Sequence, residues 1–556
     1  MMNGDKKDTS ASASGRERAD WTLRQKLGQM VMCGFDGTAP TEGILRLIRE
    51  YRLGGIIYFR RNIGRAAEVA ELSRRLREAN DALGGPPLWI AVDQEGGMVA
   101  RVDREVALAP GNMALGAAGK PELTYEAARI SGVELRQMGI NLNFAPCVDV
   151  NNNPANPVVG VRSFGENPEL VASLGAAAAR GYQEVGVSAC AKHFPGHGDT
   201  AADSHHELPL VPHSRERLEQ VELPPFRSAI LAGVDAIMTA HVRFPACDPG
   251  GVPATLSPAI LGGLLRKELG YKGVIVTDCL EMNAISQTVG VGRGAVLAVA
   301  AGADMVLVSH REDRQVEALE ALYTAVESGE LPMARIDEAV GRILRAKIWR
   351  EEVWRQTEAA GVRLVGDEAS CRWVEETAER CVTLVRAEPG ALPLRADAPT
   401  LVVWPEVRRS TEVDEVIPQE LTLGWALAPY VADVCEMVIG TEPTAAEQAA
   451  VLAAARGGRL QIVAGVYNAA FALGQASLVQ ALAALPGATV TAVALRNPYD
   501  LLAMPQVHAY AACYENRPPM LLAAAKVLAG RVPPQGRLPV SLSAEYPAGW
   551  GMDSLQ

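Results

Sequence analysis

The chain has 556 residues, more than a single hydrophobic core usually organises, so we expect two domains, the first of them large. Its hydrophobic fraction is 48%, and no uncharged apolar stretch approaches the ~18 residues that cross a bilayer, which argues against membrane insertion. A net charge of −12 argues against general nucleic-acid binding, because phosphates repel an acidic surface.

The N-terminal segment, residues 1–19, is polar, Ser-rich and charged, and has no apolar core of a secretion signal. This composition predicts a disordered leader. The nine cysteines are odd in number and form no CxxC pair. We therefore expect a reduced, cytoplasmic protein.

Residues 20–350 alternate short apolar runs with helix-length amphipathic segments such as 66–83, 121–138 and 169–185. Alternating strands and helices predict a parallel sheet, and eight such units predict that it closes into a (β/α)8 barrel. An open parallel sheet is the alternative with the same alternation. The eight predicted strands are Met30–Phe35, Gly54–Phe59, Pro87–Asp93, Asn141–Asp149, Val187–His193, Asp235–His241, Gly273–Asp278 and Ala303–Ser309.

The rest of the chain predicts a helical linker over residues 351–377 and a smaller α/β sandwich domain over residues 378–556. We expect the tail Pro533–Ser543 to form a turn and a closing strand, because Pro and Gly mark its start. No Gly-rich nucleotide loop follows the first strand of this domain. Its five predicted strands are Cys381–Arg386, Thr400–Pro405, Arg459–Tyr467, Ala488–Leu495 and Val507–Tyr514.

Polar side chains stand where several barrel strands end, at Asp93, Lys192, His193, His241 and Asp278. The active site of a (β/α)8 barrel lies at the C-terminal ends of its strands. An open sheet also binds ligands at strand ends, so the pattern predicts a site more firmly than it predicts a closed barrel.

Five of the eight histidines lie within residues 193–213, together with Asp199 and Asp203. Histidines beside carboxylates indicate proton transfer or metal binding. A zinc site could use His193, His197, His205 and Asp199, but the spacing lacks a paired-ligand pattern and the Gly and Pro content suits a mobile loop, so we expect no metal. Without a recognised motif, Asp203 could as well be a turn residue, and His205 could as well be a solvated side chain of the loop. His213 follows a proline, and we expect it in a surface turn.

Five segments follow one another along the chain: DQEGGMVAR (Asp93–Arg101), RSFG (Arg162–Gly165), KHFPGHGDTAADSH (Lys192–His205), IMTAH (Ile237–His241) and VIVTDCLEM (Val274–Met282). Together they resemble glycoside hydrolase family 3, in the β-N-acetylhexosaminidase branch that has a KHFPGHG-type loop. The resemblance extends from about residue 22 to the C-terminus, because ALRNPYD and GRLPVS are similar to the second domain of longer members. Met98 departs from the pattern, since many members have Arg after QEGG, and we expect little consequence.

The resemblance implies roles for individual residues. Asp278 matches the nucleophile, and His205 matches the proton donor, paired with Asp203, whose charge would favour the imidazolium. The residues that match contacts to sugar hydroxyls and to the N-acetyl group are Asp93, Arg101, Arg162, Lys192 and His193.

Several of these residues have a structural alternative. Asp278 could instead cap a helix, and His193 could be a satisfied core histidine. Arg101 and Arg162 could form exposed salt bridges. Asp149 and His241 are weaker candidates for contact with the ligand, and Asp149 could equally pin the loop 151–156.

The family implies a retaining, exo-acting β-N-acetylglucosaminidase whose partner is a small carbohydrate: a peptidoglycan-derived muropeptide or a chitin-derived oligosaccharide. It implies no cofactor, and we expect a monomer or homodimer without nucleic-acid or membrane partners. One alternative is a phosphorylase that uses the same site. A histidine donor places less negative charge beside the anomeric carbon than a Glu would, so a phosphate anion could replace water in the second step. A second is a catalytically silent glycan-binding protein, against which the intact Asp278, Asp203 and His205 argue.

Overall fold

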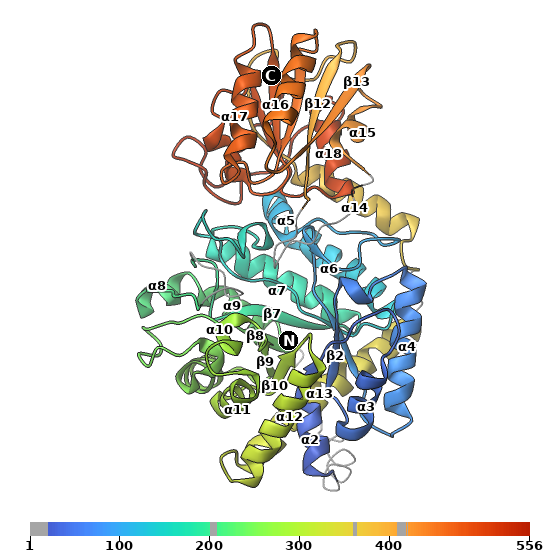
Figure 1. Ribbon diagram of the computed structural model, residues 1–556, viewed down its shortest axis with the longest axis vertical. Helices are drawn as coiled ribbons and strands as arrows, with labels where there is room; N and C mark the ends of the chain where they lie inside the picture. Colours follow the sequence, from blue (N-terminus) through green and yellow to red (C-terminus); the bar gives the residue numbers. More distant parts are fainter. Residues whose placement is uncertain (1–20, 201–207, 360–363, 409–418, 420, 556) are drawn as a thin grey trace, which may run out of the picture.

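The computed structural model describes residues 21–200, 208–359, 364–408, 419 and 421–555. Its larger part is a closed barrel of parallel strands in the order β1-β10-β9-β8-β7-β6-β3-β2, which confirms the predicted (β/α)8 fold (Figure 1). Each predicted strand is present, in most cases shorter at its ends. The barrel strands are β1 (Val31–Cys33), β2 (Gly55–Tyr58), β3 (Trp89–Val92), β6 (Leu142–Asn143), β7 (Ser188–Phe194), β8 (Ala236–Thr239), β9 (Val274–Cys279) and β10 (Met305–Val308).

Helices surround the barrel, and their apolar stripes face the strands. Several begin at residues whose side chains accept a backbone N–H in the first turn, such as Thr22, Thr41 and Asn167. The helices of this part are α2 (Leu23–Gln29), α3 (Glu42–Tyr51), α4 (Ala66–Asp81), α5 (Asn112–Ala118), α6 (Pro121–Gln137), α7 (Pro168–Glu184), α8 (Arg215–Gln220), α9 (Leu223–Leu231), the π-helix η4 (Ala259–Glu268), α10 (Asn283–Ser286), α11 (Val291–Ala301), α12 (Glu312–Glu327) and α13 (Met333–Ala359). Among the described residues, no helix combines the length and the apolar character needed to cross a bilayer.

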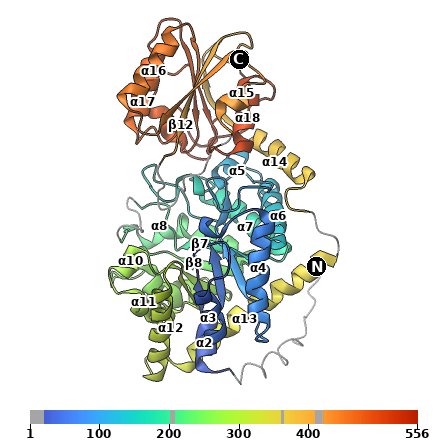
Figure 2. The same cartoon turned by 45° about the vertical axis from the view of Figure 1, so that its right-hand side comes forward.

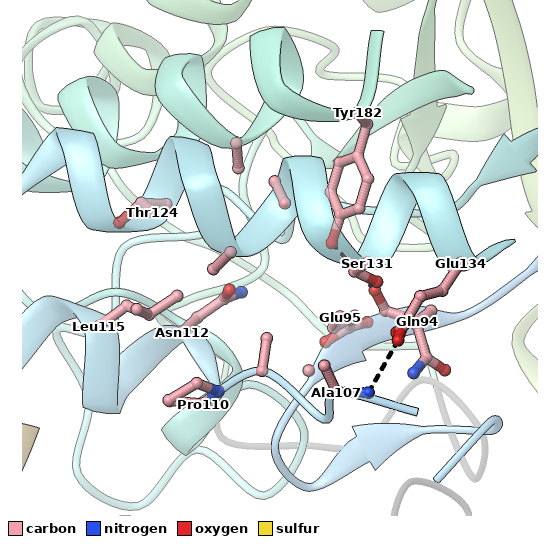
Figure 3. A pocket seen from close by; sticks show the side chains of 15 residues that line it. Gln94, Glu95, Ala107, Pro110, Asn112, Leu115, Thr124, Ser131, Glu134 and Tyr182 are labelled. Atoms are coloured by element: carbon pink, nitrogen blue, oxygen red, sulfur yellow. Dashed lines mark hydrogen bonds between the residues drawn. The ribbon is translucent and has the colours of Figure 1, made fainter. Parts of the chain in front are cut away.

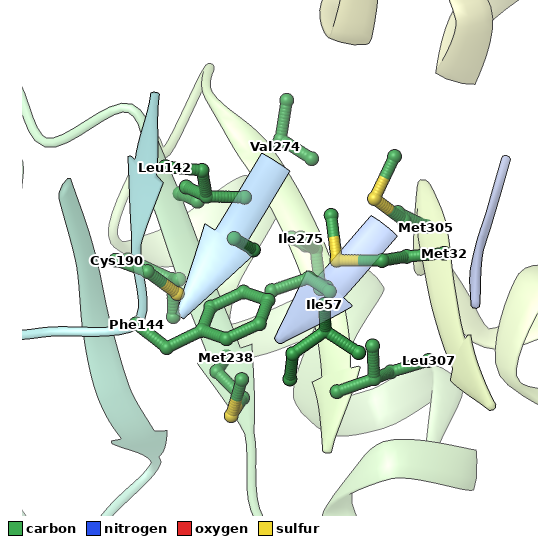
Figure 4. Close-up of a cluster of buried hydrophobic side chains, with 14 of the residues drawn as sticks. Met32, Ile57, Leu142, Phe144, Cys190, Met238, Val274, Ile275, Met305 and Leu307 are labelled. Atoms are coloured by element: carbon green, nitrogen blue, oxygen red, sulfur yellow. The ribbon is translucent and has the colours of Figure 1, made fainter. Parts of the chain in front are cut away.

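The interior of the barrel is filled by side chains rather than open as a channel (Figure 4). Met32, Ile57, Met238 and Leu307 point inward from strands around the barrel, as does Phe144 directly after β6, and all are buried. A filled interior fixes the strands relative to one another, so the residues that follow the strands are held on a rigid base.

The second domain is a six-stranded sheet in the order β11-β16-β15-β14-β12-β13, with helices on its faces (Figure 1). All neighbouring strands are parallel except β11 and β16. The strands are β11 (Thr383–Ala387), β12 (Thr400–Glu406), β13 (Val434–Gly440), β14 (Gln461–Val466), β15 (Thr489–Ala494) and β16 (Ala509–Ala512). The helices are α14 (Glu368–Cys381), α15 (Leu423–Leu427), α16 (Ala445–Arg456), α17 (Leu473–Ala483) and α18 (Pro518–Leu528).

Strand β13 is absent from the sequence-based prediction. It lies at the edge of the sheet, and Val434 to Met437 are half-buried and Val438 is exposed. Glu436 interrupts its apolar residues. An edge strand with one partner needs no continuous apolar run, so its sequence has little of the pattern that reveals a central strand.

The predicted closing strand in the tail 533–543 is wrong, because this segment forms no strand. Its backbone bonds to the barrel domain instead: Arg537 N donates to Ala117 O at 2.9 Å, and Pro539 O accepts from Glu166 N at 3.0 Å. Prolines along the tail have no N–H to give to a sheet ladder. The tail therefore joins the two domains.

The predicted linker, residues 351–377, covers the end of α13 and the first part of α14, which lies beneath the second domain (Figure 2). The domains also share a core, since Met113, Ala114 and Ala117 of α5 pack with the buried residues of the second domain. Met98 belongs to the same cluster. Met98 of the barrel domain therefore packs against apolar side chains of the second domain.

A buried carboxylate from the second domain lies at this seam. Glu515 Oε2 accepts a hydrogen bond from Gly111 N at 2.8 Å. Burial raises the pKa of Glu515 to about 7, although the Gly111 N–H and the charge of Arg517 act in the opposite direction. The ordinary pKa of a Glu is 4.5. At a pH between 4.5 and about 7, Glu515 therefore stays protonated in the folded protein but is ionised in the unfolded chain.

Stability should therefore fall as the pH rises through this window, and Glu515→Gln should remove the fall. As the pH rises from 5 to 8, the free energy of unfolding of the variant should increase relative to that of the wild type by up to about 3 kcal/mol. The gain is expected because an amide keeps an acceptor for Gly111 N and cannot ionise. Urea unfolding of both proteins at the two pH values measures this difference, and parallel pH dependences would contradict it.

Candidate active site

The polar residues selected from the sequence lie together at the C-terminal ends of the barrel strands. Asp93 follows β3, Lys192 and His193 lie in the last part of β7, and Asp278 is the penultimate residue of β9. His241 comes two residues after β8. Because these strands are neighbours or near neighbours in one closed sheet, their ends bring the side chains to one face.

A buried network of charges connects three of the substrate-binding candidates. Lys192 Nζ lies 2.7 Å from Asp93 Oδ1 and 2.7 Å from Glu95 Oε1. Arg162 holds the same Glu95 through two parallel bonds, with Nε at 2.9 Å from Oε2 and Nη2 at 2.7 Å from Oε1. The site thus contains oriented donors and acceptors suited to a neutral, hydroxyl-rich ligand.

Glu95 is the residue at the centre of this network, and the sequence analysis did not select it. Burial alone would raise its pKa, but the charges of Arg162 and Lys192 hold the pKa of Glu95 well below its ordinary value. It is therefore an anion at neutral pH and has no proton to donate. Its position two residues after Asp93 in an extended segment, where alternate side chains share a face, is the one signal that could have identified it.

Removing this charge should weaken both the fold and the binding of substrate. Glu95→Gln should lower the free energy of unfolding by about 3–5 kcal/mol, because Lys192 and Arg162 would stay buried without their shared anion. KM should rise as these two side chains lose their orientation. Urea unfolding and steady-state kinetics measure the two effects, with Glu71→Gln as the control, since Glu71 forms an exposed ion pair on α4. An unfolding curve equal to that of the wild type would contradict the prediction.

The two arginines are both buried, so neither is an exposed surface residue. Arg162 belongs to a short 3-10 turn, and its carbonyl accepts from Asn112 Nδ2 at 2.6 Å. Its Nη1 donates to Val158 O at 3.2 Å. Arg101 directly follows strand β5 (Val99–Ala100) and is 9% exposed. The salt bridge expected as an alternative for Arg162 exists, but it is internal and part of the site.

His193 is held by Asp149, which the sequence left as a weaker candidate. Asp149 Oδ2 lies 2.7 Å from His193 Nδ1, and Asp149 Oδ1 accepts from His197 N at 2.7 Å. Burial would raise the pKa of Asp149, but His193 and His197 hold it well below its ordinary value. Asp149 thus orients the start of the histidine-rich loop. The loop 151–156 is held instead by Asn156, whose Nδ2 donates to His197 O at 2.9 Å.

The described part of the histidine-rich loop does not gather the ligands of the zinc alternative. His197 Nδ1 bonds to Thr200 Oγ1 at 2.9 Å, and Asp199 Oδ2 bonds to His213 Nε2 at 2.6 Å. His193, His197 and Asp199 do not form a three-ligand group among the described residues. His213, expected in a surface turn, is half-buried and fastens this loop through Asp199.

The proposed acid and its partner, His205 and Asp203, lie outside the described residues, as does His206. One of the other histidines of the loop can be assessed. Burial, together with the charge of His193, lowers the pKa of His197 to about 4. His197 is therefore neutral near pH 7 and is a poor proton donor there.

Asp278 is half-buried at the end of β9, and its Oδ1 accepts from Cys279 N at 2.7 Å. The helix that follows, α10, begins at Asn283 and has Met282 as its N-cap. The alternative that Asp278 caps this helix is therefore wrong. A strand end fixed by the barrel and a backbone bond to one carboxylate oxygen give this side chain a defined direction.

His241 supports the same strand end. Its Nε2 donates to Cys279 O at 3.0 Å, and its Nδ1 lies 2.8 Å from Thr255 Oγ1. Both ring nitrogens thus bond to the protein, which indicates that His241 positions the backbone next to Asp278 rather than binding the ligand.

Comparisons with known proteins agree with this geometry. The model of the glycosyl hydrolase family 3 N-terminal domain matches residues 22–346. The chain is 36% identical to β-hexosaminidase A of Pseudoalteromonas piscicida over 449 residues, which are 74% of each protein. The solved glycoside hydrolase family 3 β-N-acetylglucosaminidase of Paenibacillus sp. str. FPU-7 is 52% identical and has a TM-score of 0.90, with coverage of 94% of this chain and 99% of that one.

A β-glucoside phosphorylase is similar in fold, with a TM-score of 0.79 and 98% coverage of both chains, but only 22% identity. That likeness concerns the fold alone and does not favour phosphorolysis. The family match over the whole barrel also sets aside the silent glycan-binding alternative. The chain belongs to glycoside hydrolase family 3, in its β-N-acetylhexosaminidase branch, and is a glycoside hydrolase.

Proposed function

We propose that the protein is a retaining exo-β-N-acetylglucosaminidase that removes terminal N-acetylglucosamine from muropeptides or chitooligosaccharides. The observation that carries the proposal is the buried network of Lys192, Asp93, Glu95 and Arg162 on the barrel face where Asp278 ends β9. The 52% identity to a β-N-acetylglucosaminidase supports the choice of sugar.

In this proposal, the network binds the terminal sugar. Asp93 accepts hydrogen bonds from sugar hydroxyls, and Lys192 and Arg162 donate to oxygens of the sugar and its N-acetyl group. Arg101 adds a further donor, and His193, fixed by Asp149, presents Nε2. Charged donors and acceptors that are already oriented and desolvated lose little entropy on binding, which favours one sugar in one pose.

Asp278 then attacks the anomeric carbon from one side of the ring, and a glycosyl-enzyme forms as the glycosidic bond breaks. His205, charged through its partner Asp203, donates a proton to the leaving oxygen. In the second step His205 takes a proton from water, which attacks the anomeric carbon and releases Asp278. Two inversions leave the configuration unchanged.

Hydrolysis of 4-nitrophenyl N-acetyl-β-glucosaminide in phosphate buffer tests this function, with the 4-nitrophenyl β-glucoside as the control substrate. We expect cleavage of the first only, with β-N-acetylglucosamine as the first product seen by proton NMR. Initial release of the α-anomer would contradict retention. N-acetylglucosamine 1-phosphate as the main product would show a phosphorylase.

A further inference from the structure

A short hairpin carries much of the proposed sugar-binding network. It consists of β4 (Gln94–Gly96) and β5, so Glu95 lies within it, and Asp93 and Arg101 flank it. The barrel holds the base of the hairpin, because the side chain of Asn143, at the end of β6, exchanges two hydrogen bonds with the backbone of Gln94, at 3.0 and 2.8 Å. The orientation of Glu95 and Arg101 also depends on what holds the tip.

A small pocket lies behind the hairpin, on the side of the barrel helices (Figure 3). A cavity of about 20 Å³ lies between β4 and helices α6 and α7, and its lining includes Gln94, Ser131, Glu134 and Tyr182. A space of this size is about that of one water molecule. On this side, then, the hairpin borders a gap of about one water molecule, which both polar and apolar side chains line.

The tip of the hairpin is held by the second domain. Arg517, immediately before α18, donates from Nε to Gly97 O at 2.9 Å. Glu515 lies so close that a Cβ on Gly97, where φ is +56°, would come within 2.1 Å of its carboxylate. Met98, the next residue, packs in the core of the second domain. The contacts of Arg517 and Glu515 with Gly97 join residues more than 400 positions apart, so they depend on the docking of the two domains.

The segment after Arg101 is fastened by the same arginine. Arg517 Nη1 lies 3.1 Å from Asp103 Oδ2, and Arg60 Nη1 donates to Asp103 Oδ1 at 3.0 Å. Asp103 and Arg517 have side chains only 7% and 5% exposed, so this pairing is well shielded from solvent. One residue of the second domain therefore holds the chain on both sides of Arg101.

We propose that the second domain is part of the construction of the active site, with Arg517 and Glu515 as positioning residues that hold the β4–β5 hairpin and thereby orient Glu95 and Arg101 for the N-acetylglucosaminyl group. The inference rests on the proposed function and assigns the second domain a task within it. Neither residue touches the substrate; both act through the hairpin.

Arg517→Met tests the proposal, with Lys526→Met as the matched control. Lys526 lies on α18, the helix that begins directly after Arg517, and pairs with Glu379 within the second domain. For Arg517→Met we expect KM for 4-nitrophenyl N-acetyl-β-glucosaminide to rise about 10–100-fold, with a smaller change in kcat, since a displaced network weakens binding before it touches the chemistry. Lys526→Met should keep the wild-type KM.

Hydrogen exchange of the unliganded proteins gives a readout independent of activity. Amides of residues 94–103 should exchange faster in Arg517→Met, while those of β7 should keep the wild-type rate. If Arg517 only stabilised the second domain, its substitution would speed exchange throughout that domain and would not single out residues 94–103. That result would overturn the proposal. If the wild type proved inactive on N-acetylglucosaminides, the proposed function would fail, but the exchange pattern would still decide whether the hairpin is anchored in this way.

Should Arg517→Met fail to fold, Met98→Ala replaces it, because it removes the apolar anchor of the tip without leaving a buried charge unpaired. The same two changes are expected, a higher KM and faster exchange over residues 94–103. A folded variant of either kind with unchanged KM and unchanged exchange overturns the proposal.

Discussion

Asp278→Asn should reduce kcat/KM for N-acetylglucosaminides by about 10³–10⁵-fold, because an amide cannot displace the leaving group and form the glycosyl-enzyme. The fold should persist, since the Asn carbonyl can accept from Cys279 N as the carboxylate oxygen does. Kinetics with 4-nitrophenyl N-acetyl-β-glucosaminide and thermal unfolding measure the two properties.

Glu281→Gln is the control for this variant. It makes the same change of carboxylate to amide in the loop after β9, at a residue that accepts from His310 N and Arg311 N and has no part in the proposed mechanism. We expect it to keep most of the wild-type activity. If Asp278→Asn retained more than about a tenth of the wild-type rate, Asp278 would not be the nucleophile.

His205→Ala should have an effect that depends on the leaving group. Substrates with poor leaving groups, such as chitobiose, should slow by about 10²–10⁴-fold, because the departing oxygen needs a proton. Activated aryl glycosides should be largely spared in the first step. A plot of rate against leaving-group pKa shows the difference, and equal losses for all substrates would mean that His205 does not protonate the leaving oxygen.

Asp203→Asn tests the partner of this acid. Without the neighbouring carboxylate, the imidazolium of His205 is less stable, so its pKa should fall and the basic limb of the kcat/KM profile should move to lower pH. An unchanged basic limb would make Asp203 a turn residue only. His197 is a poor substitute donor, because burial keeps its pKa near 4.

The barrel could be predicted from the sequence because each of its eight strands lies in a short, largely apolar run, and several of these runs end at a polar residue, as at Asp93, Asp278 and Ser309. This pattern survives in the structure as strands whose residues are almost all inaccessible to solvent. The same rule missed β13, whose edge position leaves its first five residues half-buried or exposed. It also suggested a closing strand in the tail, where prolines and bonds to the barrel domain leave no sheet ladder.

The candidate site was predictable where a side chain lies at or just after the C-terminal end of a strand, as for Asp93, Lys192 and Asp278. It was less so where the role of a residue comes from partners distant in sequence. Glu95 matters because Arg162 and Lys192 converge on it, and the sequence does not show that convergence. Asp149 is similar, since its task is set by His193 and His197. Long-range pairs of charges need the fold before they can be identified.

The measurement that tests the central proposal most directly is mass spectrometry of the protein inactivated by a 5-fluoro-N-acetylglucosaminyl fluoride, which slows the second step more than the first. Trypsin should release Asp278 in the peptide Gly273–Arg293, because Lys272 and Arg293 bound a stretch without other basic residues. We predict that this peptide gains the mass of one 5-fluoro-N-acetylglucosaminyl group and that fragmentation places it on Asp278. A label on another peptide, or inactivation without any covalent gain in mass, would contradict a glycosyl-enzyme on Asp278.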